Sequence, residues 1–294
     1  MIAEKEKAVP NRISEKFGML KERGEKALIT FITAGDPDLD KTKELVLVLE
    51  KAGADLIELG VPYSDPLADG PVIQEASQRA LKSGANLKKI MQTVADLRKQ
   101  TDIPIILMTY YNPLLRYGLG QVSDDAAAAG VDGFIVPDLP MEESGDFSSR
   151  LAGKGIYLIP LVAPTSGQKR IKKIAAKAAG FVYCVSLTGV TGVRQGIPEN
   201  LKEFMSIVRE STRAPLAVGF GVSTPEQVAA ISAYCDGVIV GSALVKAIAE
   251  KGGSPKLMDF IYKMVQKLKQ PLKTSKSKLR APLGGSGDGI QVSR

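Results

Sequence analysis

The stretch AGADLIELG at residues 52–60 has a close relative further along the chain, AGVDGFIVP at residues 129–137. Each begins with Ala-Gly-X-Asp and continues as a short apolar run, and CDGVIVG at 235–241 is a looser third copy. A second signature alternates with the first, because TDIP at 101–104 and TRAP at 212–215 each precede another apolar run. Signatures shared by alternate strands predict a repeated β/α unit whose odd and even strands occupy alternating layers of a barrel.

Eight apolar runs of strand length recur along the chain, and helical patterns separate them. In the first of these patterns Asp38 is placed to cap a helix and Gly53 to end it. The sequence therefore predicts an α/β protein, a single (β/α)8 barrel over residues 1–270 with an extra N-terminal helix. An open doubly wound sheet is the alternative, because periodicity alone does not show closure. The eight runs are ALITFI (27–32), DLIEL (55–59), PIILMT (104–109), GFIVP (133–137), YLIPLV (157–162), FVYCVS (181–186), PLAVGF (215–220) and GVIVG (237–241).

The net charge of +7 is located near the carboxyl end of the 294-residue chain. Residues 263–280 hold seven basic side chains and no acidic one, which equals the whole excess. A run of this kind is most often solvated, and no aromatic residue follows Tyr262 to stack on bases, so we expect no nucleic-acid partner. Residues 271–294, rich in glycine and lysine, are predicted to form a disordered basic tail.

The chain contains no histidine and only two cysteines, Cys184 and Cys235. Two cysteines make no disulfide framework and suit a reducing compartment. The first twenty residues lack an apolar signal core, and no run is long enough to span a bilayer, so we expect a cytoplasmic protein without membrane contact, or a stromal one if the source is a plant or alga. Without histidine, Ser-His-Asp and Cys-His catalysis are excluded, and proton transfer must fall to Glu, Asp, Tyr, Lys or Cys.

The segment IELGVPYSDPLADG at residues 57–70 offers carboxylates for that purpose. Side chains alternate along a strand, so the bulky Ile57 and Leu59 should face the helices while Glu58 faces the barrel mouth. Asp65 and Asp69 follow in a loop with turn chemistry, where each alone would most often cap a turn. Together with Glu58 they offer a second carboxylate, and the residues themselves leave open which aspartate supplies it.

Glycines follow the late strands, where barrels frequently bind phosphate. Gly221 ends a Gly-Phe-Gly run, Gly241 and Ser242 begin a helical pattern, and Gly189 and Gly192 flank a third turn. Glycine lets backbone amides approach a ligand, and a helix N-terminus directs free N–H groups at an anion. A plain turn is the alternative at each place, but their combination predicts a phosphorylated ligand.

Tyrosines occur near two predicted strand ends. Tyr183 alternates with Phe181 and should face the barrel interior, either at the mouth or as a core aromatic. Tyr110, Tyr111 and Asn112 stand at a predicted loop tip, where exposed aromatic side chains can mark a partner surface.

Six motifs lie at or near the predicted strand ends: FITAGDPD (31–38), IELGVPYSDPLADGPVIQ (57–74), VPDLPMEE (136–143), TGVTG (188–192), GFGVSTPEQV (219–228) and GSALV (241–245). Through these motifs the chain resembles, from about Asn11 to about Lys269, the tryptophan synthase alpha chain family. The resemblance implies a (β/α)8 barrel that cleaves indole-3-glycerol phosphate to indole and glyceraldehyde 3-phosphate, late in tryptophan biosynthesis, without metal or organic cofactor. One departure is that Leu187 follows Ser186, where some members have arginine.

The resemblance assigns roles to individual residues. Glu58 and Asp69 match the catalytic carboxylates, and Tyr183 matches a tyrosine that positions the glutamate. Glu58 would protonate indole C3 and take up the glycerol hydroxyl proton, while Asp69 would stabilise the charge at the indole nitrogen. The remaining expected positions are an indole pocket of Phe31, Leu107, Phe220 and Ile239, a phosphate site of Gly192, Gly221, Gly241 and Ser242, and a mobile loop at Thr191.

The resemblance also implies a partner, a beta chain that forms an alpha2beta2 heterotetramer and receives the indole. The expected contact residues are Asp65, Pro66, Asn112 and Pro140. Three alternatives stand beside this hypothesis. The chain could be a stand-alone lyase, or a catalytically weak activating subunit, against which the presence of Glu58 and Asp69 argues. A different phosphate-binding barrel, such as an indole-glycerol-phosphate synthase or a phosphoribosyl isomerase, is disfavoured because its lysine or cysteine groups are not evident at these strand ends.

Overall fold

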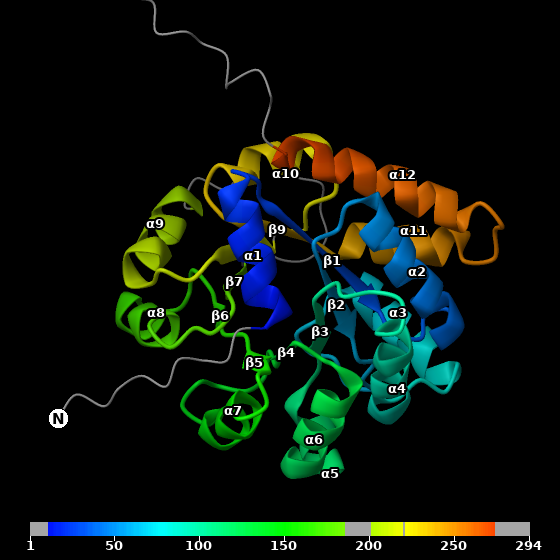
Figure 1. Ribbon diagram of the computed structural model, residues 1–294, viewed down its shortest axis with the longest axis horizontal. Helices are drawn as coiled ribbons and strands as arrows, with labels where there is room; N and C mark the ends of the chain where they lie inside the picture. Colours follow the sequence, from blue (N-terminus) through cyan, green and yellow to red (C-terminus); the bar gives the residue numbers. More distant parts are fainter. Residues whose placement is uncertain (1–10, 186–200, 220, 274–294) are drawn as a thin grey trace, which may run out of the picture.

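The computed structural model describes residues 11–185, 201–219 and 221–273, which form one sheet of parallel strands surrounded by helices (Figure 1). The strands pair in the order β5-β4-β3-β2-β1-β9-β8-β7-β6. The strands are β1 (Ala27–Thr33), β2 (Leu56–Gly60), β3 (Ile105–Met108), β4 (Gly133–Ile135), β5 (Tyr157–Leu158), β6 (Leu161–Val162), β7 (Val182–Val185), β8 (Leu216–Gly219) and β9 (Gly237–Val240). The helices are α1 (Arg12–Glu22), α2 (Leu39–Ala52), α3 (Pro71–Lys82), α4 (Leu87–Leu97), α5 (Tyr111–Tyr117), α6 (Leu119–Ala129), α7 (Gly145–Ala152), α8 (Gln168–Ala175), α9 (Leu201–Ser211), α10 (Pro225–Ser232), α11 (Ser242–Lys251), α12 (Leu257–Lys269) and the 3-10 turn η1 (Gln270–Leu272).

The two edge strands of the sheet belong to one stretch of chain. β5 pairs with β4 and β6 pairs with β7, and both lie in the predicted fifth strand at residues 157–162. Pro160 interrupts this strand because proline has no N–H to donate to a neighbour. The sheet is therefore closed through its own backbone, which confirms the (β/α)8 barrel and excludes the open doubly wound sheet.

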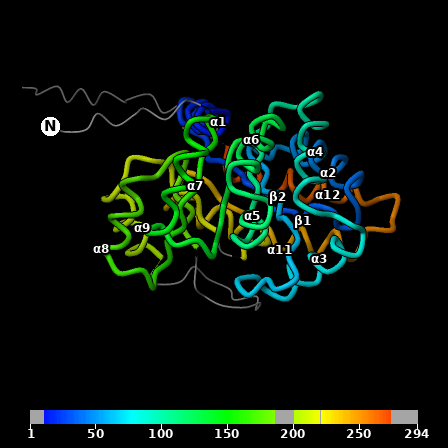
Figure 2. The backbone as a smooth tube through the Cα atoms, turned by 90° about the horizontal axis from the view of Figure 1, so that it is seen from below, coloured from blue at the N-terminus to red at the C-terminus, as the bar shows by residue number. Residues whose placement is uncertain are grey.

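Helix α1 covers the amino end of the barrel. Its buried Ile13, Phe17 and Leu20 pack with inward-facing strand residues such as Leu56. Figure 1 shows α1 in front of the strands, and Figure 2, turned by 90°, shows it at one edge of the molecule. The predicted N-terminal helix is thus confirmed, and it directs any ligand to the opposite end of the barrel.

The aspartate of each Ala-Gly-X-Asp copy, and that of the looser third copy, joins two neighbouring strands. Its carboxylate stands just before one strand and accepts a hydrogen bond from a backbone N–H at the start of the strand that precedes it in the chain. The Ala-Gly-X-Asp signature and its looser third copy therefore form the same hydrogen bond at three places, at the amino ends of the strands. The three bonds run from Leu28 N–H to Asp55 (2.7 Å), from Ile105 N–H to Asp132 (2.8 Å) and from Leu216 N–H to Asp236 (2.9 Å).

Each of these aspartates also forms an ion pair with an arginine or lysine side chain. One of these pairs involves the basic run at residues 263–280. Arg98 pairs with Asp132 at 2.6 Å, and Arg209 pairs with Asp236. Lys269 pairs with Asp55 at 2.6 Å and is only 4% exposed. The basic run is therefore not solvated throughout, because α12 uses Lys269 to neutralise a buried carboxylate.

The packed chain continues past the expected boundary at residue 270. Leu272 in η1 is 2% exposed, and its carbonyl accepts a hydrogen bond from the Lys26 N–H at 3.0 Å. Residues 274–294, expected to be disordered, lie outside the described residues. Among the described helices, none has the length and apolar character needed to cross a membrane.

Candidate active site

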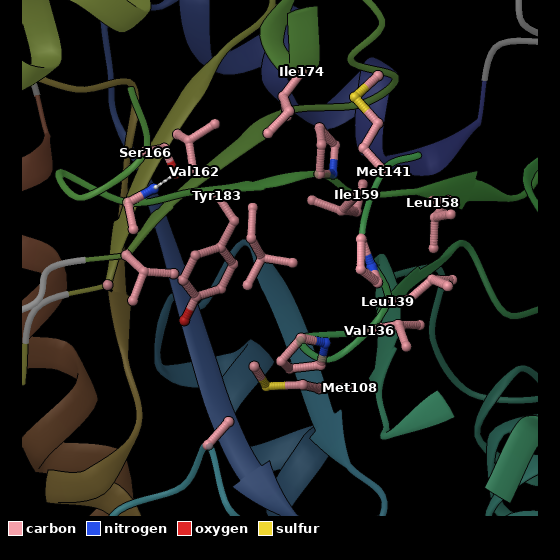
Figure 3. A pocket seen from close by; sticks show the side chains of 18 of the residues that line it. Met108, Val136, Leu139, Met141, Leu158, Ile159, Val162, Ser166, Ile174 and Tyr183 are labelled. Atoms are coloured by element: carbon pink, nitrogen blue, oxygen red, sulfur yellow. Dashed lines mark hydrogen bonds between the residues drawn. The ribbon is translucent and has the colours of Figure 1, made fainter. Parts of the chain in front are cut away.

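A cavity of about 970 Å³ opens at the carboxyl ends of the strands and extends between α7 and α8. Figure 3 shows the ring of Tyr183 extending into it, with apolar side chains such as Met108 and Ile159 around the ring. A pocket of this size and mixed polarity accommodates a small organic molecule. The predicted site residues that line it are Phe31, Asp69, Pro140, Tyr183, Gly221, Ile239, Gly241 and Ser242.

Glu58 lies on β2 with its side chain directed into the barrel. Leu56, on the same face, belongs to the interior cluster, whereas Ile57 and Leu59 pack against the helices, as the alternation predicted. Glu58 is fully buried, and neither carboxylate oxygen has a hydrogen-bond partner among the described residues. Burial disfavours the charged form and raises the pKa of Glu58 to about 8. At neutral pH this group therefore holds a proton that it can donate.

Asp69 lies in the loop after β2, on the cavity wall. Its backbone N–H donates to the Pro66 carbonyl at 3.0 Å, and its own carbonyl accepts from Gln74 Nε2 at 2.9 Å. Burial raises the pKa of Asp69 to about 6, while a hydrogen-bonding interaction with the Tyr110 hydroxyl acts in the opposite direction. Asp69 is thus mostly ionised at neutral pH, in contrast to Glu58. Asp65 is exposed and does not line the cavity, so the structure selects between the two aspartates.

Tyr183 projects from β7 across the end of β8. A Cβ added to Gly219 would lie 2.7 Å from the Tyr183 hydroxyl, so the tyrosine occupies the space that a side chain at 219 would fill. Burial, with Glu58 and Asp69 nearby, raises the pKa of Tyr183 well above its usual value. The tyrosine therefore remains a neutral hydroxyl beside both carboxylates.

Phe31 on β1 forms an apolar part of the cavity wall and packs closely against two glycines. A Cβ added to Gly60 would lie 2.5 Å from the tip of the Phe31 ring, and one added to Gly241 would lie 3.3 Å from the Phe31 Cβ. Ile239 on β9 also lines the cavity. These side chains can accommodate a flat apolar ring, as predicted for indole.

Leu107 does not lie where the indole pocket was expected. It is fully buried in the cluster between the sheet and the helices, whereas its neighbour Met108 lines the cavity. Successive residues of β3 point to opposite faces of the sheet. An error of one residue therefore assigns a side chain of the outer core to the cavity. Met108 therefore replaces Leu107 as the candidate contact from this strand.

The candidate phosphate site centres on the start of α11. Gly241 precedes the helix without a side-chain cap, and both Gly241 and Ser242 line the cavity. Gly221 has a φ of +63°, which favours glycine, and no atom of the described residues lies within 4 Å of a Cβ placed there. Free N–H groups of a helix start beside open backbone suit an anion. The expected positions Thr191, Gly192 and Phe220 lie outside the described residues.

The predicted partner residues lie in the segments that follow β2, β3 and β4, and of them Pro140 lines the cavity. Asp65, Asn112 and Pro140 are exposed and Pro66 is half-buried. Sequence reasoning missed Leu67, whose side chain is 93% exposed and contributes an apolar contact surface to the same loop. Its place between two prolines of a conspicuous motif would have been the signal.

Within the described ranges, no group of three or more His, Cys, Asp or Glu side chains is placed to hold a metal ion. At the carboxyl end of the closed parallel barrel stand two carboxyl groups with different pKa values and an apolar wall, an arrangement that suits a barrel enzyme working by proton transfer.

Comparison with known proteins identifies which enzyme family this is. Residues 17–275 match the family model described as tryptophan synthase alpha chain. A Thermoanaerobacter tryptophan synthase alpha chain is 50% identical over 262 residues, covering 89% of this chain and 100% of the relative. The crystal structure of tryptophan synthase subunit alpha from Legionella pneumophila superposes with a TM-score of 0.84 at 38% identity, covering 90% of this chain and 99% of that one. The chain belongs to the tryptophan synthase alpha chain family.

Proposed function

We propose that this chain cleaves indole-3-glycerol phosphate to indole and glyceraldehyde 3-phosphate, with Glu58 as the acid and Asp69 as the base. The observation that carries the assignment is that Glu58 is fully buried without a hydrogen-bond partner among the described residues, whereas Asp69 stands on the cavity wall; burial to different degrees gives them pKa values of about 8 and about 6. Near neutral pH one is protonated and the other ionised, as paired acid–base chemistry requires. Family membership supports the reaction itself.

The proton transfers balance without a further co-reactant. Glu58 donates its proton to indole C3 while Asp69 accepts the proton of the indole nitrogen, which leaves a neutral indolenine. Glu58, now ionised, takes the proton of the glycerol hydroxyl as the carbon–carbon bond breaks and the aldehyde forms. The electron pair of that bond restores the indole ring, and the nitrogen recovers its proton from Asp69.

The surroundings of the carboxylates support this division of work. The Tyr183 hydroxyl remains neutral and can orient Glu58, and Phe31 and Ile239 supply an apolar wall for the ring. The start of α11 would hold the phosphate. Indole is small and apolar, so passing it directly to a beta chain in an alpha2beta2 assembly would prevent its loss to solvent. The exposed Leu67, with the exposed Asp65 in the same loop, supports such docking. A cytoplasmic location, supported by the bacterial relatives, completes the proposal.

The test is an indole-release assay with indole-3-glycerol phosphate at a series of pH values. The kcat/KM should rise as Asp69 ionises near pH 6 and fall as Glu58 ionises near pH 8. Glu58→Gln and Asp69→Asn should each reduce turnover by roughly 10²-fold or more while substrate still binds. Near wild-type turnover in either variant would contradict the two-carboxylate mechanism. A rate unchanged by saturating beta chain would favour a stand-alone lyase, and binding of the beta chain without indole release would favour an activating subunit.

A further inference from the structure

Tyr110 follows β3 and was expected to be an exposed aromatic at a loop tip, but it is only 7% exposed. Its hydroxyl accepts a hydrogen bond from the Ala68 N–H at 2.9 Å. The carboxylate of Asp69, the next residue, lies near enough to this hydroxyl for the hydroxyl to lower its pKa. One side chain from the third β/α unit therefore binds the backbone of the loop after β2, at the residue next to Asp69.

The loop that carries Asp69 has few other connections. Among the described residues, the remaining hydrogen bonds of 65–69 stay within the stretch from Ser64 to Asp69 or reach Gln74 of the following α3. Leu67 is almost fully exposed, so packing does not fix the centre of the loop. Among the described residues, the bond between the Ala68 N–H and the Tyr110 hydroxyl is therefore the one hydrogen bond that connects residues 65–69 to another β/α unit.

Tyr110 is itself held by neighbours. Its ring lies 5.1 Å from the ring of Tyr63, and the Tyr63 hydroxyl accepts from Asn112 Nδ2 at 3.2 Å. The adjacent Tyr111 N–H donates to Asp138 Oδ1 at 2.9 Å, which connects the loop after β4. Two aromatic rings and three loops thus fix the position of the Tyr110 hydroxyl.

We propose that Tyr110 is the positioning residue of Asp69, because its hydroxyl binds the Ala68 N–H and so fixes the loop that carries the carboxylate. This inference rests on the proposed function of Asp69 as the base. Tyr110 itself need not touch the substrate, because its described side-chain contacts are to the Ala68 N–H and the Tyr63 ring.

The electrostatic effect of the hydroxyl follows from the groups around Asp69. Glu58 on β2 and Tyr183 on β7 face the same region, and Asp138 after β4 lies near Tyr110. The Tyr110 hydroxyl lowers the pKa of Asp69 against the effect of burial. Without that hydroxyl, Asp69 would keep its proton to a higher pH and a smaller fraction could act as base.

The decisive variant is Tyr110→Phe, which keeps the ring against Tyr63 and removes only the hydroxyl. We expect the acid limb of the kcat/KM profile to move up by roughly 0.5–1 pH unit and kcat to fall roughly tenfold, with KM changed much less. Tyr117→Phe is the matched control, because it removes a hydroxyl that bonds Asp125 Oδ2 at 2.6 Å on the helical surface. The control should leave the acid limb unchanged.

A double variant tests whether Tyr110 acts through Asp69. In an Asp69→Asn background, Tyr110→Phe should lower the remaining turnover by less than about twofold, because the group it positions is gone. A full tenfold further loss, or an acid limb that does not move in the single variant, would overturn the proposal.

A titration of 13C-labelled aspartate by NMR separates this proposal from the proposed function. The Asp69 carboxyl signal should titrate at higher pH in Tyr110→Phe than in the unaltered protein. Absence of indole release by the unaltered chain with its beta chain would reject the function, whereas an unchanged Asp69 titration would reject the positioning role whatever the turnover.

Discussion

The burial of Glu58 predicts that the stability of this protein falls as the pH rises, and that Glu58→Gln removes this fall. The folded-state pKa of the group is about 8, against an ordinary value of 4.5. Between these values the folded chain holds a proton that the unfolded chain has released. Unfolding then releases a proton, so higher pH favours the unfolded state across this window. Stability from this group is complete below the ordinary pKa and declines up to the folded-state pKa.

The size of the effect follows from the pKa shift. Each unit of pH well inside the window changes the free energy of unfolding by about 1.4 kcal/mol, and the change is smaller near either pKa, so roughly 3 to 4 kcal/mol is lost between about pH 5 and pH 8. Urea unfolding of both proteins at intervals across this range measures it. The free energy of unfolding of Glu58→Gln, minus that of the unaltered chain, should increase by roughly 3 to 4 kcal/mol from the lowest to the highest pH. A buried amide without partners adds an offset that does not depend on pH.

Glu44→Gln is a suitable control, because Glu44 is an exposed carboxylate paired with Lys41 at 2.8 Å. Its difference from the unaltered chain should stay nearly flat over the same range. If the Glu58→Gln difference were equally flat, Glu58 would be ionised in the folded protein, and its assignment as the acid would fail with it.

Three further predictions concern the phosphate, the carboxyl end and the partner. Gly241→Val should reduce by at least roughly tenfold the preference for indole-3-glycerol phosphate over indole-glycerol in calorimetric titration, because its side chain blocks the start of α11; an unchanged preference would place the phosphate elsewhere. Deleting residues 274–294 should leave the melting temperature unchanged, whereas Leu272→Ala should cost about 2–4 kcal/mol because its side chain is 2% exposed; a large loss on deletion would show that the tail packs on the barrel. Leu67→Ser should weaken beta-chain binding by roughly tenfold or more, measured by sedimentation, since burying a leucine contributes about 2 kcal/mol; unchanged binding would remove Leu67 from the interface.

Much of the fold follows from local sequence patterns. The helix from Leu39 to Ala52 begins after Asp38, whose side chain caps it, and ends at Gly53 with a φ of +110°, as predicted. The two Thr-X-X-Pro signatures share one turn, because Thr101 accepts from the Ile103 N–H and Thr212 from the Ala214 N–H. Such bonds join residues two positions apart, so the sequence specifies them without the rest of the chain.

The site was only partly predictable, because some of its residues are placed by local backbone geometry and others by contacts with distant parts of the chain. Glu58 faces inward because alternation along a strand is a local property. Leu107 was misplaced because the end of β3, and thus which of two neighbours lines the cavity, depends on packing by other strands. Tyr110 was interpreted as exposed because nothing near it in the sequence indicates the Ala68 contact, 42 residues away.

By itself the sequence determined where the strands lie along the chain, the inward direction of Glu58 and the candidate carboxylates. Backbone geometry sets periodicity and capping over a few residues, so these features are local. Only the tertiary structure decided that the sheet closes at residues 157–162, that Asp69 rather than Asp65 reaches the cavity, and that Lys269 neutralises Asp55 from 214 residues away. It also decided that Glu58 has no hydrogen-bond partner among the described residues and therefore a raised pKa. Desolvation and charge pairing depend on which distant residues meet, and that is settled when the whole barrel packs.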